Sequence, residues 1–484
     1  MKLSRREFVR WAGAASIAAA LTGCDAFRAL GLSPMASIDG DSWRAPDSNV
    51  RDLASHTLAR LSFGPRPGDY ARVREMGAEA YIEEQLAPDA LDDSYCDSLV
   101  RRLESLTQPR GELFEYKPEF LLDEMTRGKL LRAVYSRRQL CEVMVDFWSD
   151  HFNIDSSKGD CRWLKADDDR DVIRLHALGM FPDLLRASAL SPAMLWYLDG
   201  RVNRKASRAD KPNENYAREL LELHTLGVNG GYTQRDVMET ARCLTGWTVR
   251  SKQFLRNGSV EFHPDQHDGA EKSVLGHTIP AGLAERDLDE VLRLAAQHPA
   301  TGRHIAFKLC RRFISDSPSE PAVASVAQTF QTTNGDIKAT LRTLFGSDAF
   351  RTSSDTKIKR PFHYLASALR VTAAKTDAGA ALQDYLLRMG HAPFQYPTPD
   401  GFPEEAAPWM GSLMWRWHFA RALADNRLPG VHVDWPKLAS MFDGAEGLAA
   451  HTLGRKPTPE EQRALLATNA DPATLLASPG FQRF

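Results

Sequence analysis

Cysteine is scarce in this chain of 484 residues: there are six, and no two of them form a C-x-x-C pair. A zinc ribbon and a c-type haem attachment site are therefore excluded. Five of the cysteines lie far apart, namely Cys96, Cys141, Cys161, Cys243 and Cys310. One or two disulfides could join them in an oxidising compartment, but their odd number leaves at least one thiol free.

Several catalytic signatures are also missing. The sequence has no G-x-S-x-G elbow, P-loop, G-x-G-x-x-G fingerprint or H-E-x-x-H pair. The α/β-hydrolase, nucleoside-triphosphate and simple dinucleotide chemistries thereby lose most of their support. The formal net charge is only -2, which gives no general attraction to nucleic acid, so nucleic acid is not an expected partner.

The first 24 residues are typical of a targeting segment. "SRREF" places twin arginines before an apolar run that is too short for a permanent membrane span, and the run ends in "LTGC" at Cys24. This ending resembles a bacterial lipobox, which predicts lipidation at Cys24 and an anchor in the lipid bilayer. Asp25 then resembles the signal for retention at the inner membrane. We expect export by the twin-arginine route, which often carries proteins with a cofactor or metal already bound, to the periplasmic side of a bacterial membrane.

The remaining sequence predicts a tether and one large helical domain. Residues 25–49 are rich in Ser, Asp, Pro and Gly without a sustained period, whereas residues 50–484 are dominated by helical patterns. Helices are expected near Val172–Arg186, Asp287–Gln297, Gly302–Phe313, Ile337–Phe345 and Phe362–Ala374. One β-hairpin is expected over Phe254–Phe262, around Asn257-Gly258. The fold class is therefore mainly α, with a small β-hairpin insertion.

A dense group of charges falls within "NENYARELLELHTLG", which reads as a helix capped by Asn213 and stopped by Gly227. Helical spacing puts its charged side chains and Asn215 on one arc, with His224 among the leucines of the opposite arc. The arc makes these residues candidates for acid/base, ligand or anion-binding roles: Glu214, Arg218, Glu219 and Glu222. His224 is interpreted as a core histidine.

A second helix follows after a glycine-rich turn. "TQRD" matches a capping box that starts this helix at Thr233, and Asp236, Glu239 and Arg242 recur along it at three-residue steps. The two helices form an αα-hairpin, too acidic for a DNA-reading helix-turn-helix. We expect the two charged helices to meet and to enclose a partly buried site.

Another acidic stripe lies in "CEVMVDFWSDHFN". Glu142, Asp146 and Asp150 are spaced four residues apart, and His151 follows the last of them. Like charges one helical turn apart lower the stability of the helix unless a cation neutralises them. One interpretation is a metal or acid/base site that includes His151, and the other is a solvated face topped by Arg138.

The loop "FHPDQHDG" offers His263, Asp265, His267 and Asp268 within six residues. Two imidazoles and a carboxylate can converge on a divalent metal ion, which makes His263, His267 and Asp268 candidate ligands. The alternative is a structural loop held together by Asx and His hydrogen bonds.

Aromatic rings gather in a proline-rich segment near the C-terminus: Phe394, Tyr396, Phe402, Trp409, Trp415 and Trp417. Such rings could stack on the faces of sugars, or they could pack the segment onto the domain.

The motif "NENYARELLELHTLGVNGGYTQRDVMETARCLTGW" resembles the signature of the bacterial family called domain of unknown function 1800. Similar blocks are "ARLSFGPRPGD", "FWSDHFNI", "FHPDQHDGAEKSVLG", "HIAFKLCRRFISD", "PFQYPTPDGFPE" and "LLASPGFQRF". The resemblance runs from about Ser55 to Phe484 and implies no established activity. Many members have Phe where this chain has His224, and many are encoded beside a sulfatase-like family, which implies a sulfatase-like partner protein.

Two functions remain open from the sequence. The first is an exported, membrane-anchored envelope enzyme, a metal-assisted hydrolase acting on extracellular polymers, with His151, Glu214, Arg218, Glu219 and Glu222 as catalytic candidates. The second is a non-catalytic companion that binds a co-exported sulfatase-like protein.

Overall fold

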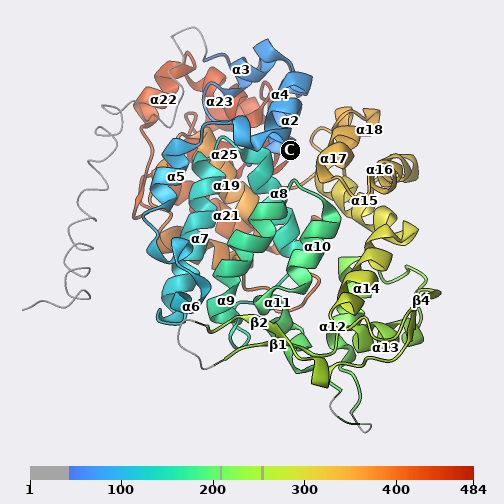
Figure 1. Cartoon of the computed structure of the whole chain (residues 1–484). Helices are drawn as coiled ribbons and strands as arrows, with labels where there is room; N and C mark the ends of the chain where they lie inside the picture. Colours follow the sequence, from blue (N-terminus) through green and yellow to red (C-terminus); the bar gives the residue numbers. More distant parts are fainter. Residues whose placement is uncertain (1–42, 206, 208–209, 252–255) are drawn as a thin grey trace, which may run out of the picture.

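The computed structural model describes residues 43–205, 207, 210–251 and 256–484. The predicted signal, lipidation and most of the tether, including Cys24, lie outside the described residues. Helices dominate the described chain and strands are few and short (Figure 1), which confirms the mainly α fold class.

The first half of the fold is a succession of helices broken by short turns. In chain order the α-helices are α2 (Leu53–Leu61), α3 (Asp69–Met76), α4 (Ala78–Leu86), α5 (Ser94–Val100), α6 (Arg110–Leu113), α7 (Pro118–Tyr135), α8 (Gln139–His151), α9 (Cys161–Asp168), α10 (Phe181–Ala189), α11 (Pro192–Tyr197), α12 (Glu214–Glu219) and α13 (Gln234–Cys243). Short 3-10 turns lie at Pro88–Ala90, Glu104–Thr107 and Gly200–Val202.

The second half continues in the same manner. Its α-helices are α14 (Arg286–Gln297), α15 (Pro299–Phe313), α16 (Glu320–Thr332), α17 (Ile337–Phe345), α18 (Asp348–Arg351), α19 (Pro361–Val371), α20 (Ala380–Arg388), α21 (Leu413–Ala424), α22 (Trp435–Met441), α23 (Ala445–Leu453), α24 (Pro459–Ala467), α25 (Pro472–Ala477) and α26 (Pro479–Gln482). Further 3-10 turns lie at Pro264–Gln266 and Ala407–Ser412.

Two helical segments have the wider π-helical turn. One is Asp169–Arg174, directly after α9, and the other is Leu220–His224, directly after α12. The helix expected over 172–186 is therefore wrong in its extent, because α10 begins only at Phe181 after a break. The expected helices near 287–297, 302–313, 337–345 and 362–374 match α14, α15, α17 and α19 to within a few residues.

The strands form three two-stranded antiparallel sheets within the described chain. They are β1 (Trp247–Val249) with β2 (Val260–Phe262), β3 (Lys272–Val274) with β4 (His277–Ile279), and β5 (Lys375–Thr376) with β6 (Val431–His432). The expected hairpin had its second arm at β2, which is correct, but Val260 pairs with Val249. Part of the expected first arm, residues 254 and 255, lies outside the described residues. Gly258 has a positive φ of 80°, as the turn there requires.

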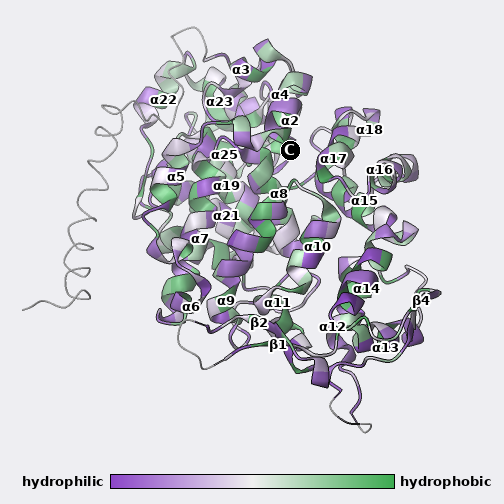
Figure 2. Cartoon of the chain, viewed as in Figure 1, coloured by the Kyte–Doolittle hydropathy of each residue, from purple (hydrophilic) through white to green (hydrophobic). Residues whose placement is uncertain are grey.

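One large hydrophobic core joins nearly all the helices. Its buried residues run from Ala54 in α2 to Phe481 in α26, and the ribbons in Figure 2 change from hydrophilic to hydrophobic around single helices, as amphipathic packing requires. The two ends of the described chain lie together: the amide of Lys456 donates to the carbonyl of Ser48, and α2 to α4 neighbour α22 and α23 in Figure 1.

All five cysteines within the described residues are free thiols, so the disulfides that the sequence allowed are not formed. Among the same residues, none of the helices combines the length and the apolar character that crossing a membrane requires.

Candidate functional site

The acidic stripe of α8 points into the protein. The side chains of Glu142, Asp146 and Asp150 are only 9%, 2% and 15% exposed. Glu142 is bound by Arg174 at 2.9 Å, whereas the guanidinium of Arg138 donates to the carbonyl of Leu91. The interpretation as a solvated face is therefore wrong, because each of these carboxylates forms an ion pair with a cation from a distant segment.

Asp146 is the centre of a buried ion cluster. Its carboxylate forms an ion pair with Lys129 at 2.8 Å and accepts hydrogen bonds from Arg312 at 3.1 Å and from Arg360 at 2.5 Å. Burial alone would raise the pKa of Asp146, but these cations hold it well below its usual range. Arg360 continues outward from this cluster to Asp150 at 2.5 Å and to Glu404 at 3.3 Å.

A pocket of about 230 Å³ opens above this cluster. It lies between the C-terminal end of α8, the middle of α15 and the loop that follows Tyr396. Its lining residues are Phe147, Asp150, His151, Lys308, Arg311, Tyr396, Asp400, Gly401, Phe402, Pro403, Glu404 and Glu405. Among the catalytic residues expected from the sequence, His151 lies in this pocket.

The two carboxylates that share Arg360 are shifted in opposite directions. Burial, with Asp146 nearby, raises the pKa of Asp150 despite the pull of Arg360. Burial would raise the pKa of Glu404 too, but Arg312 and Arg360 lower it. The pocket lining thus contains one carboxyl whose pKa is raised and another whose pKa is lowered.

His151 has both ring nitrogens engaged. Nε2 lies 3.1 Å from the carbonyl oxygen of His224, which can only accept, so this nitrogen carries the hydrogen. Nδ1 is then an acceptor, and it receives a hydrogen bond from Nζ of Lys308 at 2.9 Å. Burial, with Lys308 close by, lowers the pKa of His151 well below its usual value. His151 is therefore a neutral acceptor that orients Lys308.

The charged arc of α12 is partly buried. Asn213 caps the helix, and Arg218 pairs with Glu214 at 3.1 Å and with Glu222 at 3.5 Å, all as predicted. The side chains of Arg218, Glu214 and Glu222 are 37%, 34% and 24% exposed, and Gln234 of α13 bonds to Arg218 and Glu214, so the two charged helices meet. A catalytic or ligand-binding role for these residues stays a prediction. The π-helical turn from Leu220 onward also alters the spacing on which the arc was drawn.

Glu219 differs from its neighbours because it approaches the pocket. Burial, Glu222 and, to a smaller extent, Asp400 of the pocket raise the pKa of Glu219. Of the arc, this residue is the one whose surroundings connect it electrostatically to the pocket lining.

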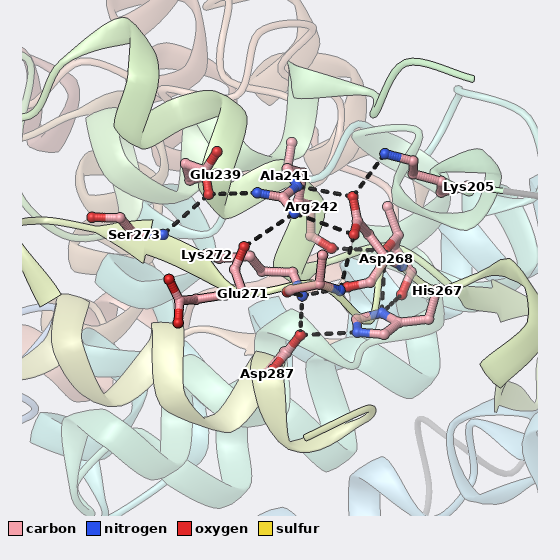
Figure 3. A network of polar contacts seen from close by, with 12 residues as sticks. Lys205, Glu239, Ala241, Arg242, His267, Asp268, Glu271, Lys272, Ser273 and Asp287 are labelled. Atoms are coloured by element: carbon pink, nitrogen blue, oxygen red, sulfur yellow. Dashed lines mark hydrogen bonds and ion pairs between the residues drawn. The ribbon is translucent and has the colours of Figure 1, made fainter. Parts of the chain in front are cut away.

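Two of the three candidate metal ligands, His267 and Asp268, belong to a polar network that includes Arg242 of α13 (Figure 3). Asp268 is bound by Arg242 at 2.8 Å and by Lys205 at 3.0 Å. His267 contacts the carbonyl of Thr245 through Nδ1 at 2.9 Å and Asp287 through Nε2 at 2.9 Å. These are the contacts of the structural-loop interpretation, in which protein groups satisfy both residues.

The side chain of His263 is not part of the bonds described for that network. Its backbone amide donates to Gly246, and its side chain is half-exposed. Over the part of the chain that the structure describes, no three His, Cys, Asp or Glu side chains are grouped so that they could hold a metal ion. Metal binding at His263, His267 and Asp268 stays a prediction, testable by metal analysis of the folded protein.

The aromatic segment serves mainly to pack the pocket loop. Phe394, Phe402 and Trp409 are buried. The rings of Tyr396 and Phe402 are in contact at a tilt of 51°, with centroids 4.6 Å apart, and both line the pocket, whereas Trp417 is 52% exposed. Packing thus explains three of the rings, and Tyr396 and Phe402 provide an aromatic wall.

The sequence did not point to five charged residues of the site. Four of them are cationic, and the fifth is acidic: Lys129, Lys308, Arg312, Arg360 and Glu404. The blocks "HIAFKLCRRFISD" and "PFQYPTPDGFPE" contain three of these residues. Charged residues within an otherwise apolar helical run were the available signal, because such residues need buried partners.

Fold and site together define an α-helical protein with a charged pocket closed by a proline-rich loop. A family model described as protein of unknown function (DUF1800) matches residues 56–483, so the chain belongs to this family. Neither the comparison with curated proteins nor that with solved structures returns a similar chain.

Proposed function

We propose that this protein is an exported, membrane-anchored envelope enzyme that hydrolyses extracellular polymers or their fragments in the pocket above Asp146. The observation that carries the proposal is the pair of carboxyl groups at Asp150 and Glu404, whose pKa values are shifted in opposite directions around one arginine. Such a pair can divide the work of an acid and an ionised stabilising group.

Each carboxyl group has a role in this proposal. Asp150, with its raised pKa, donates a proton to the oxygen of the leaving group. Glu404, held ionised by Arg312 and Arg360, stabilises positive charge that develops on the substrate. Within the described ranges, no three His, Cys, Asp or Glu side chains are grouped so that they could hold a metal ion. The described contacts therefore give more support to an acid–base hydrolase than to a metal-assisted one.

The shape of the pocket favours a small part of a polymer. A volume of about 230 Å³ suits one unit or a chain end rather than a long segment. Aromatic faces beside carboxylates are also typical of sites for sugars, and Tyr396 and Phe402 supply such faces here. Asp400 adds an acceptor for hydroxyl groups in the pocket lining.

The test is an activity panel on envelope polysaccharides and peptidoglycan fragments, with Asp150→Asn beside the wild type. Asn keeps the shape and an acceptor for Arg360 but cannot supply the proton, so activity should fall at least about 100-fold. The matched control is Asp289→Asn, which removes an exposed pair with Arg186 and should leave activity unchanged. Absence of hydrolysis by folded wild-type protein over the whole panel would contradict the proposal.

Export and anchoring are tested separately through Cys24. Lipidation of this residue is supported by the lipobox-like "LTGC" after twin arginines. Cys24→Ala should release the protein from the membrane fraction and change its mature mass. Retention in the detergent phase with an unchanged mass would refute the anchor.

One surface feature favours the second candidate, a companion that binds a sulfatase-like protein. Four exposed apolar side chains follow helical spacing from the end of the pocket loop into α21: Met410, Leu413, Met414 and Trp417. Exposed stripes of this kind mark protein contacts. Co-purification of a co-expressed sulfatase-like protein with the wild type, and its loss with Met414→Lys and Trp417→Lys, would support this function.

A further inference from the structure

Lys308 provides the primary amine among the residues that line the pocket. Lys308 lines the pocket from α15. No ion pair joins it to a carboxylate among the described residues, and the hydrogen bond that its Nζ makes there goes to Nδ1 of His151. This contrasts with Lys129, whose Nζ is bound to Asp146 at 2.8 Å within the cluster below.

The partner of this amine is fixed in its tautomer. Nε2 of His151 donates to the carbonyl of His224, so the lone pair of Nδ1 is directed at Lys308. His304, one turn before Lys308 on α15, is held in turn by the carbonyl of Leu223 at 3.2 Å. A nucleophile, an adjacent base and a third group that orients the base form a common arrangement for activating a side chain, and here Lys308, His151 and the carbonyl of His224 occupy these positions.

The surroundings of Lys308 increase the neutral fraction of its amine near neutral pH relative to an ordinary lysine. Burial is the main cause, and it lowers the pKa of Lys308 to about 8, with Arg311 acting in the same direction. The groups that face Lys308 are Asp150 and His151 of α8, His224 after α12, His304 and Arg311 of α15, and Asp400 and Glu404 of the pocket loop. The carboxylates of Asp150, Glu404 and Asp400 act in the opposite direction and raise the pKa of Lys308. None of these carboxylates forms an ion pair or hydrogen bond with Lys308 among the described residues.

We propose that Lys308 forms a reversible imine with the carbonyl carbon of a small aldehyde or ketone bound in this pocket. The lone pair of the neutral Nζ attacks the carbonyl carbon, and the carbonyl oxygen takes up the first of the two amine hydrogens to give a neutral carbinolamine. This oxygen then leaves as water together with the two hydrogens of the amine, and a C=N bond remains. Water reverses both steps, so no oxidant, reductant or further reactant is required.

The pocket limits the ligand to a short carbonyl compound with hydroxyl groups, such as the open-chain form of a sugar. Its volume of about 230 Å³ holds one such molecule, and Asp400 and Glu405 offer acceptors for hydroxyl groups. This chemistry goes beyond the proposed hydrolysis, since it uses the amine rather than the Asp150 and Glu404 pair.

The experiment traps the imine on the purified full chain. Glycolaldehyde and sodium cyanoborohydride are added at pH 7, and peptide mass spectrometry follows reductive alkylation at each lysine. Because an amine with a pKa of about 8 is neutral far more often at pH 7 than an ordinary lysine, Lys308 should react at least about tenfold faster than exposed Lys437. Both sites are compared within one wild-type molecule, so the result does not depend on a variant that folds.

Three variants sharpen the outcome. Lys437→Arg should leave the labelling of Lys308 unchanged, whereas Lys308→Arg should remove the fast site and leave the slow ones. Asp150→Asn should abolish hydrolysis while Lys308 still labels rapidly, so failure of one proposal is distinguishable from failure of the other. Labelling of Lys308 no faster than that of Lys437 would overturn the imine proposal.

Discussion

Gly401 lies directly against the backbone of Asp150. A Cβ built at position 401 would stand 2.1 Å from the carbonyl oxygen of Asp150, and Gly401 has a positive φ of 76°. Backbone atoms cannot move aside as the tip of a long side chain can, so residue 401 must be glycine for the loop to close on α8. This contact holds the pocket loop, with Asp400, Phe402 and Glu404, over the end of α8.

We expect Gly401→Ala to open the pocket. The clash with Asp150 and the left-handed backbone together should destabilise the fold by about 2–4 kcal/mol, since overpacking and strain each cost a few kcal/mol at most. The matched control is Gly411→Ala, because a Cβ there meets no atom within 4 Å. Chemical denaturation of both variants measures the difference, and equal midpoints would show that the loop does not depend on this contact.

Asp146→Asn should be among the most damaging single changes in the protein. It leaves Lys129, Arg312 and Arg360 facing each other with one carboxylate fewer, and breaking a buried ion pair costs about 3–5 kcal/mol. Asp289→Asn removes an exposed pair with Arg186 and should cost at most about 1 kcal/mol. Thermal melts compare the two, and a small loss for Asp146→Asn would mean that the cluster tolerates its missing charge.

Acid should remove the contribution of the same carboxylate. The folded pKa of Asp146 is held below the unfolded value, so the stability it confers is present above about pH 4 and is lost as the pH falls further. In the wild type, the free energy of unfolding should therefore decrease below about pH 4, and Asp146→Asn should show a smaller decrease there. Identical slopes for the two proteins in this range would contradict the role of Asp146.

The local features of the fold were readable from the sequence because they depend on neighbouring residues. The Asn213 cap, the Thr233 capping box with Asp236 and the left-handed Gly227 each follow from short-range rules. The hairpin arm was misplaced because Val249, the partner of Val260, lies across a longer connection. Periodicity gives the face of a strand but not its partner.

The site could be predicted only in part from the sequence, because its residues come from segments that lie far apart in the chain. His151 and the stripe of α8 drew attention through their spacing, but Arg360 reaches Asp146 across 214 residues. The charged arc of α12 had more regular spacing and yet lies nearer to solvent. Regular spacing within a helix shows which side chains share a face, and burial of that face depends on the whole fold.

The variants Arg218→Ala and Arg242→Ala compare how much the ion pairs of α12 and of α13 contribute to stability. Arg218→Ala should cost at most about 1 kcal/mol, because the side chains of Arg218, Glu214 and Glu222 are 37%, 34% and 24% exposed, so water screens their ion pairs. Arg242→Ala should cost about 2–3 kcal/mol, because the side chain is 20% exposed and binds Asp268, which is 5% exposed. Thermal melts of the two variants decide, and a larger loss for Arg218→Ala would support the partly buried site expected at α12.

His224 is buried without a hydrogen bond to its ring. It is 0% exposed, it packs on Phe152 with ring centroids 5.0 Å apart, and neither ring nitrogen has a partner within the described chain. Burial, together with Lys308 and His304, lowers the pKa of His224 to about 3. The ring is therefore neutral in the folded protein, and the cost of its two unsatisfied nitrogens is not repaid.

His224→Phe should stabilise the protein, since a ring of similar shape replaces the unsatisfied nitrogens at a gain of about 1–2 kcal/mol. The unfolded state takes up a proton at this histidine below about pH 6.5, whereas the folded state does so only near pH 3. Wild-type stability should therefore fall as the pH drops through this interval, and His224→Phe should lose less. The control His451→Phe removes a ring whose Nε2 contacts the carbonyl of Val371 at 3.1 Å, so it should destabilise at neutral pH. Denaturation curves at pH 7 and pH 5 test both signs: a destabilised His224→Phe protein with an unchanged acid response would mean that the ring nitrogens are satisfied in solution.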